Sequence, residues 1–166
     1  MAAAEKTLEQ KLDKEILTLI KRSGIDKRFL ISSNTLTYSN FLNNKMLMMW
    51  IIKEGVPYSL FDLILHYTPF TENYWAELLD LSTKSLQRYK ESSRQFKPIQ
   101  SEKIIEVAEV TNVGLDVFGD MEKFKLWLDT PNYALGNVKP LELLSDSYGK
   151  EMVIGELTRI NYGILA

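Results

Sequence analysis

Apolar residues near the start of the chain recur every three or four positions, which is the spacing of one face of an α-helix. The pattern covers residues 5–23, and Lys21 and Arg22 suit the negative end of a helix dipole. Gly24 follows, as glycine often does at a helix C-terminus. We predict an amphipathic helix that packs either on its own domain or on a partner, through Leu8, Leu12, Ile16, Leu19 and Ile20.

The next three segments differ sharply in apolar patterning. Residues 31–44 are polar with weak alternation, so we expect a loop or a short strand there. Residues 45–54 are strongly apolar and are followed by Gly55 and Pro57, which predicts a short helix that ends at Gly55. Residues 58–67 are apolar on almost every side, which predicts a buried helix.

Two short helices joined by a tight turn follow in the middle of the chain. We predict helices over residues 72–79 and 83–91, with the turn at 80–82. A further helix follows, with Ser101 as its expected N-cap. Its core side is expected to consist of Ile104, Ile105, Ala108 and Val113.

From Gly114 onward the pattern changes to short helices broken by glycine, proline and asparagine. Their expected first residues or N-caps are Asp120, Pro140 and Asp146, and their expected ends are Leu128, Leu144 and Gly163. The expected apolar stripe of the last helix is Met152, Val153, Leu157 and Ile160. No strand pattern is strong enough to predict a sheet, so the expected fold class is all-α.

The composition removes several classes of chemistry. The 166 residues include no cysteine, which excludes disulfides, thiolate metal sites and cysteine nucleophiles. His66 is the single histidine and has no neighbour at ligand spacing, so we expect it to be structural. There is no glycine-rich phosphate loop and no nucleophile beside a base. We therefore expect a protein that is not an enzyme and that needs no cofactor or metal.

No segment predicts a membrane span. The longest apolar run, residues 46–52, is far shorter than the ~20 residues that a span needs. The N-terminus shows no signal-peptide pattern, and the lack of cysteine fits a reducing cytosol. We expect a soluble, cytoplasmic protein.

Positive charge is concentrated in the middle of the chain, although the net charge is −2. Residues 81–100 contain one acid, Glu91, and the cations Lys84, Arg88, Lys90, Arg94 and Lys97. Attraction between charges is screened within about 8–10 Å, so a local cationic element is enough to place one helix on DNA. From residue 101 onward acids outnumber cations, which predicts a partner surface of basic character.

The middle pair of helices has the residue types that a DNA-binding helix-turn-helix requires. Ala76 is small where the second helix must approach, and Trp75 and Leu79 are apolar on either side of it. The turn has Asp80 where glycine is usual, but aspartate tolerates left-handed backbone better than most residues. The expected buried positions beyond the turn are Leu81, Leu86 and Tyr89.

The second helix of this pair presents polar side chains on its outer side and at its leading end. Gln and Arg make bidentate hydrogen bonds to base edges in the major groove, whereas Lys suits phosphates. We predict DNA contacts from Ser82, which is also the expected N-cap, and from Thr83, Lys84, Ser85, Gln87, Arg88 and Lys90, with Arg94 on a phosphate. An ordinary helical corner has the same spacing, so this pattern leaves that alternative open.

The C-terminal sequence resembles a known family. Its motifs are "VFGD" (117–120), "WLDTPNYALGN" (127–137), "KPLELL" (139–144) and "YGKEMVIGELTRINYG" (148–163). Their order and spacing are similar to those of the toxin-binding domain of Xre/MbcA/ParS-type antitoxins, which belong to bacterial type II toxin–antitoxin systems. Upstream, "LDLSTKSLQRYK" followed by "QSEKIIEVAEV" resembles the Xre-like helix-turn-helix of the same family. The resemblance covers about residues 55–166 and leaves residues 1–54 uncovered.

The chain departs from this family pattern at its DNA-binding part. The family often has T-L-x-R-R in the second helix, whereas residues 85–89 are "SLQRY". It often has a basic loop with leucine after that helix, whereas this chain has "SSRQFKPIQ". These departures concern the operator sequence and the strength of DNA binding, and they leave the C-terminal match untouched.

The resemblance implies a helix-turn-helix domain at residues 55–113 and a toxin-binding domain at 114–166. We expect residues 1–54, which it does not cover, to form an N-terminal helical extension. The resemblance also implies an antitoxin that covers the active site of a RES-domain toxin, which consumes NAD⁺, and that represses its own operon by binding operator DNA. The residues expected by analogy to enter or border the toxin's pocket are Arg159, Asn161, Tyr162, Gly163, Ile164 and Leu165.

Several alternatives stay open at this point. Helix-turn-helix repressors commonly bind palindromic half-sites as dimers, so we expect a homodimer. A free-standing transcriptional regulator would share the helix-turn-helix but would leave the C-terminal motifs unexplained. An inhibitor whose helix-turn-helix is only a structural corner is the other alternative. Tyr162 could also pack on its own domain instead of on a toxin.

Overall fold

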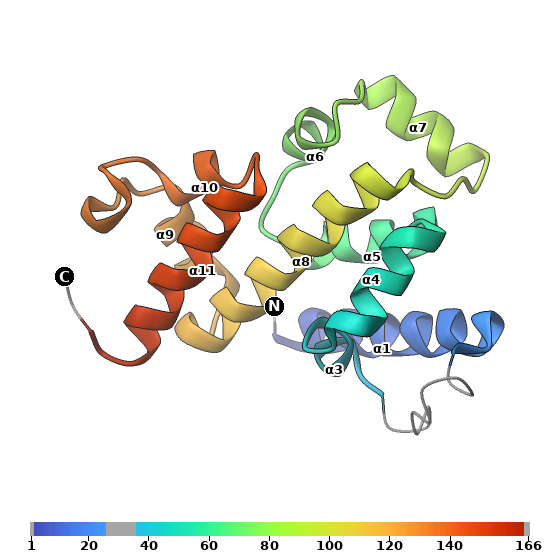
Figure 1. The fold of residues 1–166 in the computed structure, drawn as a ribbon, viewed down its shortest axis with the longest axis horizontal. Coiled ribbons are helices and arrows are strands. Elements are labelled where there is room, and N and C mark those ends of the chain that lie inside the picture. Colours follow the sequence, from blue (N-terminus) through green and yellow to red (C-terminus); the bar gives the residue numbers. More distant parts are fainter. Residues whose placement is uncertain (1, 26–35, 165–166) are drawn as a thin grey trace.

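The computed structural model describes residues 2–25 and 36–164, and within these residues the chain is helical with no strand. The all-α expectation is therefore confirmed. The helices are α1 (Ala2–Ser23), α3 (Tyr38–Leu42), α4 (Lys45–Glu54), α5 (Tyr58–Tyr67), α6 (Glu72–Leu78), α7 (Thr83–Glu91), α8 (Pro98–Phe118), α9 (Met121–Leu128), the 3₁₀ helix η2 (Tyr133–Leu135), α10 (Pro140–Leu143) and α11 (Ser147–Asn161) (Figure 1).

The long helix α8 runs through the middle of the molecule and contacts both of its halves (Figure 1). Helices α3, α4 and α5 pack against it in the N-terminal half, and α9 and α11 pack against it in the C-terminal half. Its buried residues extend from Ser101 to Gly114 without a break in the helix. The domain boundary expected between residues 113 and 114 therefore lies inside one continuous helix.

The first helix is part of the same core as the helix-turn-helix. Helix α1 packs on α5 and α3, and its residues Leu12, Ile16 and Ile20 are fully buried. Each such side chain contributes about 1.5–3 kcal/mol when it leaves water. The hydroxyl of Tyr67 in α5 also donates a hydrogen bond to Glu9 Oε1 at 2.6 Å. The predicted amphipathic helix thus packs on its own domain.

The segment expected to be a loop or a short strand is helical over part of its length. Residues 31–35 lie outside the described residues, but Tyr38–Leu42 form helix α3. Thr37 and Asn40 cap this helix reciprocally, each accepting a hydrogen bond from the backbone N–H of the other. The polar residues that weakened the pattern are therefore capping residues, which favour a helix start over a strand.

The expected N-cap at Ser101 is wrong. Helix α8 begins at Pro98 after Lys97, because proline lacks the N–H that would be unsatisfied in a first turn. Ser101 is fully buried one turn later. Its Oγ accepts a hydrogen bond from the N–H of Val56 at 2.8 Å and donates one to the carbonyl of Phe96 at 3.2 Å. It joins three chain segments instead of starting a helix.

The expected apolar stripe of the last helix is partly wrong. Val153 and Leu157 are fully buried, but Met152 is 49% exposed. The side of α11 that faces the core includes Gly149 and Glu156 instead. The other expected features of the C-terminal half are confirmed: Asp120 and Asp146 are N-caps, and Pro140 begins a helix.

The described residues also bear on whether the chain has a membrane-spanning helix or a metal-binding group. Within the described ranges, no helix is long and apolar enough to cross a membrane. The same residues hold no group of three or more histidines or acids placed to bind a metal ion. His66 lies on the surface of α5, where its Nδ1 is 2.7 Å from the carbonyl oxygen of Asp62 in the preceding turn.

Candidate functional site

The helix-turn-helix corner consists of α6, α7 and the turn between them. Trp75 and Leu79 of this corner are buried, and Ala76 is buried where α7 approaches. Asp80 has a φ of 53°, the left-handed conformation that the sequence required of the turn. The N–H of Leu81 then donates to the carbonyl of Ala76 at 2.9 Å and closes the turn. The residue types that predicted the corner therefore occupy their expected places.

An aromatic cluster fixes the angle between the two helices. The ring of Phe61 meets those of Trp75 and Phe96 edge to face, with centroids 5.3 and 4.9 Å apart. Tyr89 of α7 stacks on Phe96 at 4.7 Å. Aromatic pairs of this kind add about 0.5–1.5 kcal/mol beyond their buried area. Tyr89 stands where the resemblance expects a basic residue, and it has a packing role there.

The loop after α7 is anchored to the start of α5. The N–H of Tyr58 donates to the carbonyl of Arg94 at 3.1 Å, and the N–H of Phe96 donates to the carbonyl of Val56 at 2.9 Å. The guanidinium of Arg94 lies 5.9 Å from the centre of the Tyr89 ring, within range of a cation–π contact. The loop that differs from the family pattern is therefore held close to α7.

Helical spacing divides the residues predicted to contact DNA into two sets. One set is exposed and shares one face of α7, and it consists of Thr83, Lys84, Gln87 and Arg88. Ser82 precedes this face as the N-cap and accepts a hydrogen bond from the N–H of Ser85 at 3.0 Å. Lys90, three residues after Gln87 and seven after Thr83, is exposed at the edge of the same face, whereas Ser85 is half-buried. The structure thus brings five of the seven residues together on one surface.

The same face ends in an acid that sequence reasoning did not include among the site residues. Glu91 lies one turn after Gln87 and accepts a hydrogen bond from Gln87 Nε2 at 3.3 Å. The spacing of four residues was the available signal. A carboxylate can accept from cytosine N4 in the major groove, but it repels phosphates. Glu91 therefore restricts how Gln87 can point and where α7 can approach a nucleic acid.

The residues expected to contact a toxin lie at the C-terminal end of α11. Tyr162 is 75% exposed and Ile164 is 54% exposed, so Tyr162 does not pack on its own domain. Gly163 has a φ of 69°, and the N–H of Ile164 donates to the carbonyl of Arg159 at 2.9 Å. This left-handed cap turns the chain away from the helix axis. Leu165, the last of the expected contacts, lies outside the described residues.

Arg159 and Asn161 complete this end of α11. Both are exposed. Arg159 Nη1 lies 3.4 Å from Glu156 Oε2, and the Glu156 side chain is 10% exposed. The carboxylate orients the guanidinium from the core side of the helix. An arginine held in this way can still form a bidentate contact with a carboxylate or phosphate of a partner.

More apolar surface is exposed in this half than the sequence predicted. Tyr148 is 83% exposed on α11, beside the already noted Met152, and Tyr133 and Leu126 are 83% and 70% exposed on neighbouring elements. Single exposed apolar residues are normal, but a group of them marks an interaction surface. The signal in the sequence was the density of aromatic and aliphatic residues between 126 and 164, which exceeds what one small core can bury.

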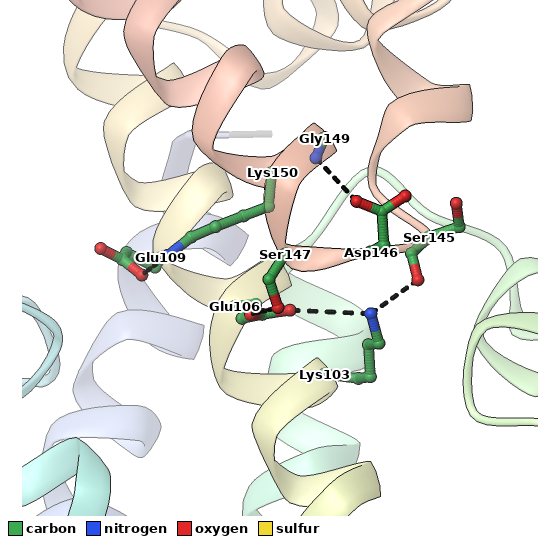
Figure 2. A network of polar contacts seen from close by, with 8 residues as sticks. All are labelled: Lys103, Glu106, Glu109, Ser145, Asp146, Ser147, Gly149 and Lys150. Atoms are coloured by element: carbon green, nitrogen blue, oxygen red, sulfur yellow. Dashed lines mark hydrogen bonds and ion pairs between the residues drawn. The ribbon is translucent and has the colours of Figure 1, made fainter.

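A polar network fastens α11 to α8 (Figure 2). Ser147 Oγ of α11 donates to Glu106 Oε1 of α8 (2.7 Å), and Lys150 of α11 forms an ion pair with Glu109 of α8 (2.7 Å). Lys103 Nζ of α8 donates to the carbonyl of Ser145, two residues before α11 (2.6 Å). The side chains of the ion pair are 18% and 26% exposed, so water screens it less than a surface pair. Because α8 also belongs to the helix-turn-helix core, the network holds α11 at a fixed place relative to the corner.

A second link joins the two halves at α6. The hydroxyl of Tyr74 donates a hydrogen bond to the carbonyl of Leu141 in α10 at 3.1 Å. Burial raises the pKa of Tyr74 above its ordinary value, so the phenol remains a donor throughout the physiological pH range. The two halves are thus joined by a shared helix and by polar contacts on two sides.

Two family models match consecutive parts of the chain. The model described as "Antitoxin Xre-like helix-turn-helix domain" matches residues 51–109, and the model described as "Antitoxin Xre/MbcA/ParS C-terminal toxin-binding domain" matches residues 114–163. Together they cover about two thirds of the chain.

A curated relative agrees with both matches. The chain is 27% identical over 116 residues to "Antitoxin Xre" of Yersinia enterocolitica serotype O:8 / biotype 1B (strain NCTC 13174 / 8081). That alignment covers 69% of this chain and 78% of the Yersinia protein. With a helix-turn-helix and a toxin-binding domain in consecutive order along it, the chain belongs to the Xre/MbcA/ParS family of antitoxins.

Proposed function

We propose that this antitoxin neutralises its toxin by covering the entrance of the toxin's active site with the C-terminal end of α11. The observation that carries the proposal is the exposure of Tyr162, inside the matched toxin-binding domain, and of Ile164, the residue directly after that match. Exposed tyrosine and arginine side chains are the types that most often dominate binding energy at protein interfaces. Tyr162 and Arg159 supply one of each, and Asn161, Gly163, Ile164 and Leu165 complete the proposed contact.

We propose further that the toxin is a RES-domain protein that consumes NAD⁺ and that the pair forms a type II system in the cytoplasm. The support is the order of the C-terminal motifs, which resembles that of antitoxins with such partners. The NAD⁺ chemistry would then belong to the toxin, and the antitoxin would act as a regulatory protein without catalysis of its own.

The helix-turn-helix is proposed to repress the antitoxin's own operon. Support comes from the ordered corner and from the exposed face of α7 that carries Lys84, Gln87 and Arg88. Two such helices in a homodimer would enter successive major grooves about 34 Å apart, as other helix-turn-helix dimers do. Ser82, Thr83, Ser85 and Lys90 would support this contact from the N-cap and the flanks of the helix.

The neutralisation proposal is tested by measuring NAD⁺ consumption by the protein encoded beside this gene, with and without the antitoxin. The full chain should inhibit at a ratio near one to one. Deletion of residues 162–166 should abolish most inhibition, because loss of an interface anchor such as Tyr162 costs about 2 kcal/mol or more. This deletion keeps Ile160, which is half-buried, so the helix itself should remain folded.

The matched control is Met49→Ala, which removes a 58% exposed apolar side chain from α4 in the other half. It should inhibit like the full chain. Full inhibition by the deleted chain would show that the end of α11 does not block the toxin. Inhibition of a neighbouring protein that consumes no NAD⁺ would leave neutralisation standing and reject the RES assignment.

A further inference from the structure

Five positions of α11 recur at alternating intervals of four and three residues along one side of the helix. They are Tyr148, Met152, Gly155, Arg159 and the C-cap residue Tyr162. This spacing aligns side chains in the manner of a seam between packed helices. The side that faces the core is different and consists of Gly149, Val153, Glu156 and Leu157. We refer to the first set as the α11 stripe.

The α11 stripe is open to solvent along its whole length. The exposed fraction is 83% for Tyr148, 49% for Met152 and 75% for Tyr162. Gly155 and Arg159 are exposed between them. Ile164 continues the apolar surface past the end of the helix. Three large exposed apolar side chains in one line differ from the single scattered residues of an ordinary surface. The stripe therefore has the form of a contact surface.

Gly155 at the centre of the stripe has no explanation within the antitoxin itself. Glycine in the middle of a helix destabilises it relative to alanine. Among the described helices, interior glycines occur at positions 114, 149 and 155. A Cβ at Gly114 would collide with the ring of Phe124, and a Cβ at Gly149 would collide with the carbonyl oxygen of Leu143. Apart from its two chain neighbours and the backbone of its own helix, a Cβ at Gly155 would meet no atom within 4 Å.

We propose that the main chain of the toxin packs directly against Gly155, between Tyr148 and Met152 on one side and Arg159 and Tyr162 on the other. Glycine is the residue that permits such a close approach of another backbone. The toxin would then hold α11 along its length, and the contact at the C-terminal end would be one part of a longer interface. This inference rests on the proposed neutralisation of a toxin by this half of the chain.

Two observations favour the toxin as the occupant. The matched toxin-binding domain, residues 114–163, contains the entire α11 stripe. The stripe is also continuous with the exposed end of α11, where Tyr162 and Ile164 form the proposed contact. A second copy of this chain is the competing occupant, and the experiment below distinguishes the two.

The test compares Gly155→Ala and Gly155→Leu with the full wild-type chain. The probe is the purified protein encoded beside this gene, with affinity measured by calorimetry and the Tm measured by circular dichroism. Gly155→Ala should raise the Tm, because alanine favours the helix and the site is empty, yet it should weaken toxin binding about tenfold through the added methyl group. Gly155→Leu should weaken binding by about a hundredfold or more without lowering the Tm. A gain in stability with a loss of binding is an outcome that a purely structural role would not produce.

The control is Glu102→Leu, which adds the same side chain at an exposed position of α8 and should leave toxin affinity within about threefold of wild type, as expected away from an interface. If wild type itself does not bind the neighbouring protein, the proposed function fails. If wild type binds and both Gly155 variants bind equally well, only the close approach at Gly155 is rejected. A change of mass in light scattering for Gly155→Leu, with toxin affinity unchanged, would assign the stripe to a second copy and also overturn the inference.

Discussion

The two halves of the molecule that share α8 present different kinds of side chain to solvent. The helix-turn-helix half buries its aromatic rings, Phe61, Trp75 and Phe96, and exposes cations on α7 and the following loop. The C-terminal half places an ion pair, Lys150 with Glu109, between its helices and exposes aromatic and aliphatic side chains along α11. Both halves keep an apolar core, but one presents cations on α7 to solvent and the other presents aromatic and aliphatic side chains on α11.

This contrast predicts different physics for the two proposed interactions. Cationic surfaces bind nucleic acid largely by releasing counterions, so their affinity falls steeply as salt rises. Apolar surfaces bind by removing area from water, an effect that salt screening does not weaken. If the proposed functions are right, salt should separate DNA binding from toxin binding in the same protein.

The largest expected effect is a loss of stability confined to the C-terminal half. Gly149→Ala should destabilise the chain by about 3 kcal/mol or more, because the new methyl group would collide with the backbone carbonyl of Leu143, which cannot move aside as a side chain can. Urea unfolding measures the loss, and hydrogen exchange should locate it in α10 and α11. Toxin binding should weaken more than DNA binding. Gly155→Ala, in the same helix but in open space, is the matched control, and equal stability of wild type and Gly149→Ala would contradict the packing argument.

A smaller expected effect is a loss of promoter affinity when side chains of the helix-turn-helix half are removed. Replacing Arg88 or Gln87 with alanine should each weaken binding to the operon's promoter by about 1–3 kcal/mol, the usual contribution of a base contact. Fluorescence anisotropy at several salt concentrations measures the loss and the salt slope. Toxin affinity should stay constant in both variants, and it should change much less than promoter affinity across the same salt range. Lys125→Ala, a lost cation on α9, controls for a general change of charge.

Unchanged promoter affinity in both variants would remove α7 from the DNA interface. It would favour the alternative of an inhibitor whose helix-turn-helix is a structural corner only. The hydrogen bond from Gln87 to Glu91 provides a further test of these two alternatives. If α7 is only a structural corner, Glu91→Ala should leave promoter affinity unchanged. If α7 contacts DNA, the same substitution frees the Gln87 side chain and should change promoter affinity.

The success of sequence-based prediction in this chain depends on whether a feature is decided locally. The caps at Ser82, Asp120 and Asp146 act on backbone groups three residues away, and all three are where the sequence placed them. Ser101 has equally suitable capping chemistry, but its hydroxyl is taken by the N–H of Val56, 45 residues earlier. No local pattern contains such a contact, so the start of α8 was misplaced.

The same limit applies to the candidate sites. The exposed face of α7 followed from spacing, because Leu86 is a strong buried anchor and defines the opposite side. Helix α11 has apolar residues on two adjacent sides, and packing on α8 through Gly149 and Glu156 decides which side is buried. The sequence therefore identified the end of α11 as a surface but assigned Met152 to the core, and it did not distinguish Gly155 from a glycine required by the fold.

The smallest expected effect is a difference between the two halves in how the stabilisation by a helix cap depends on pH. Helix α7 is capped by the hydroxyl of Ser82, whereas α9 is capped by the carboxylate of Asp120. The hydrogen bond from the N–H of Lys123 lowers the pKa of Asp120 below its ordinary value of 3.8. A lowered pKa means that this cap stabilises the folded state at pH values above 3.8 and loses its contribution as the pH falls through the folded-state pKa.

The Tm difference between wild type and Asp120→Ala should thus be constant from pH 7 to 5 and shrink progressively below pH 3.8. The Tm difference between wild type and Ser82→Ala should not change with pH in this way. Thermal melts across this range measure both, and a difference for Asp120→Ala that stayed constant into acid would show that the cap does not act through its charge.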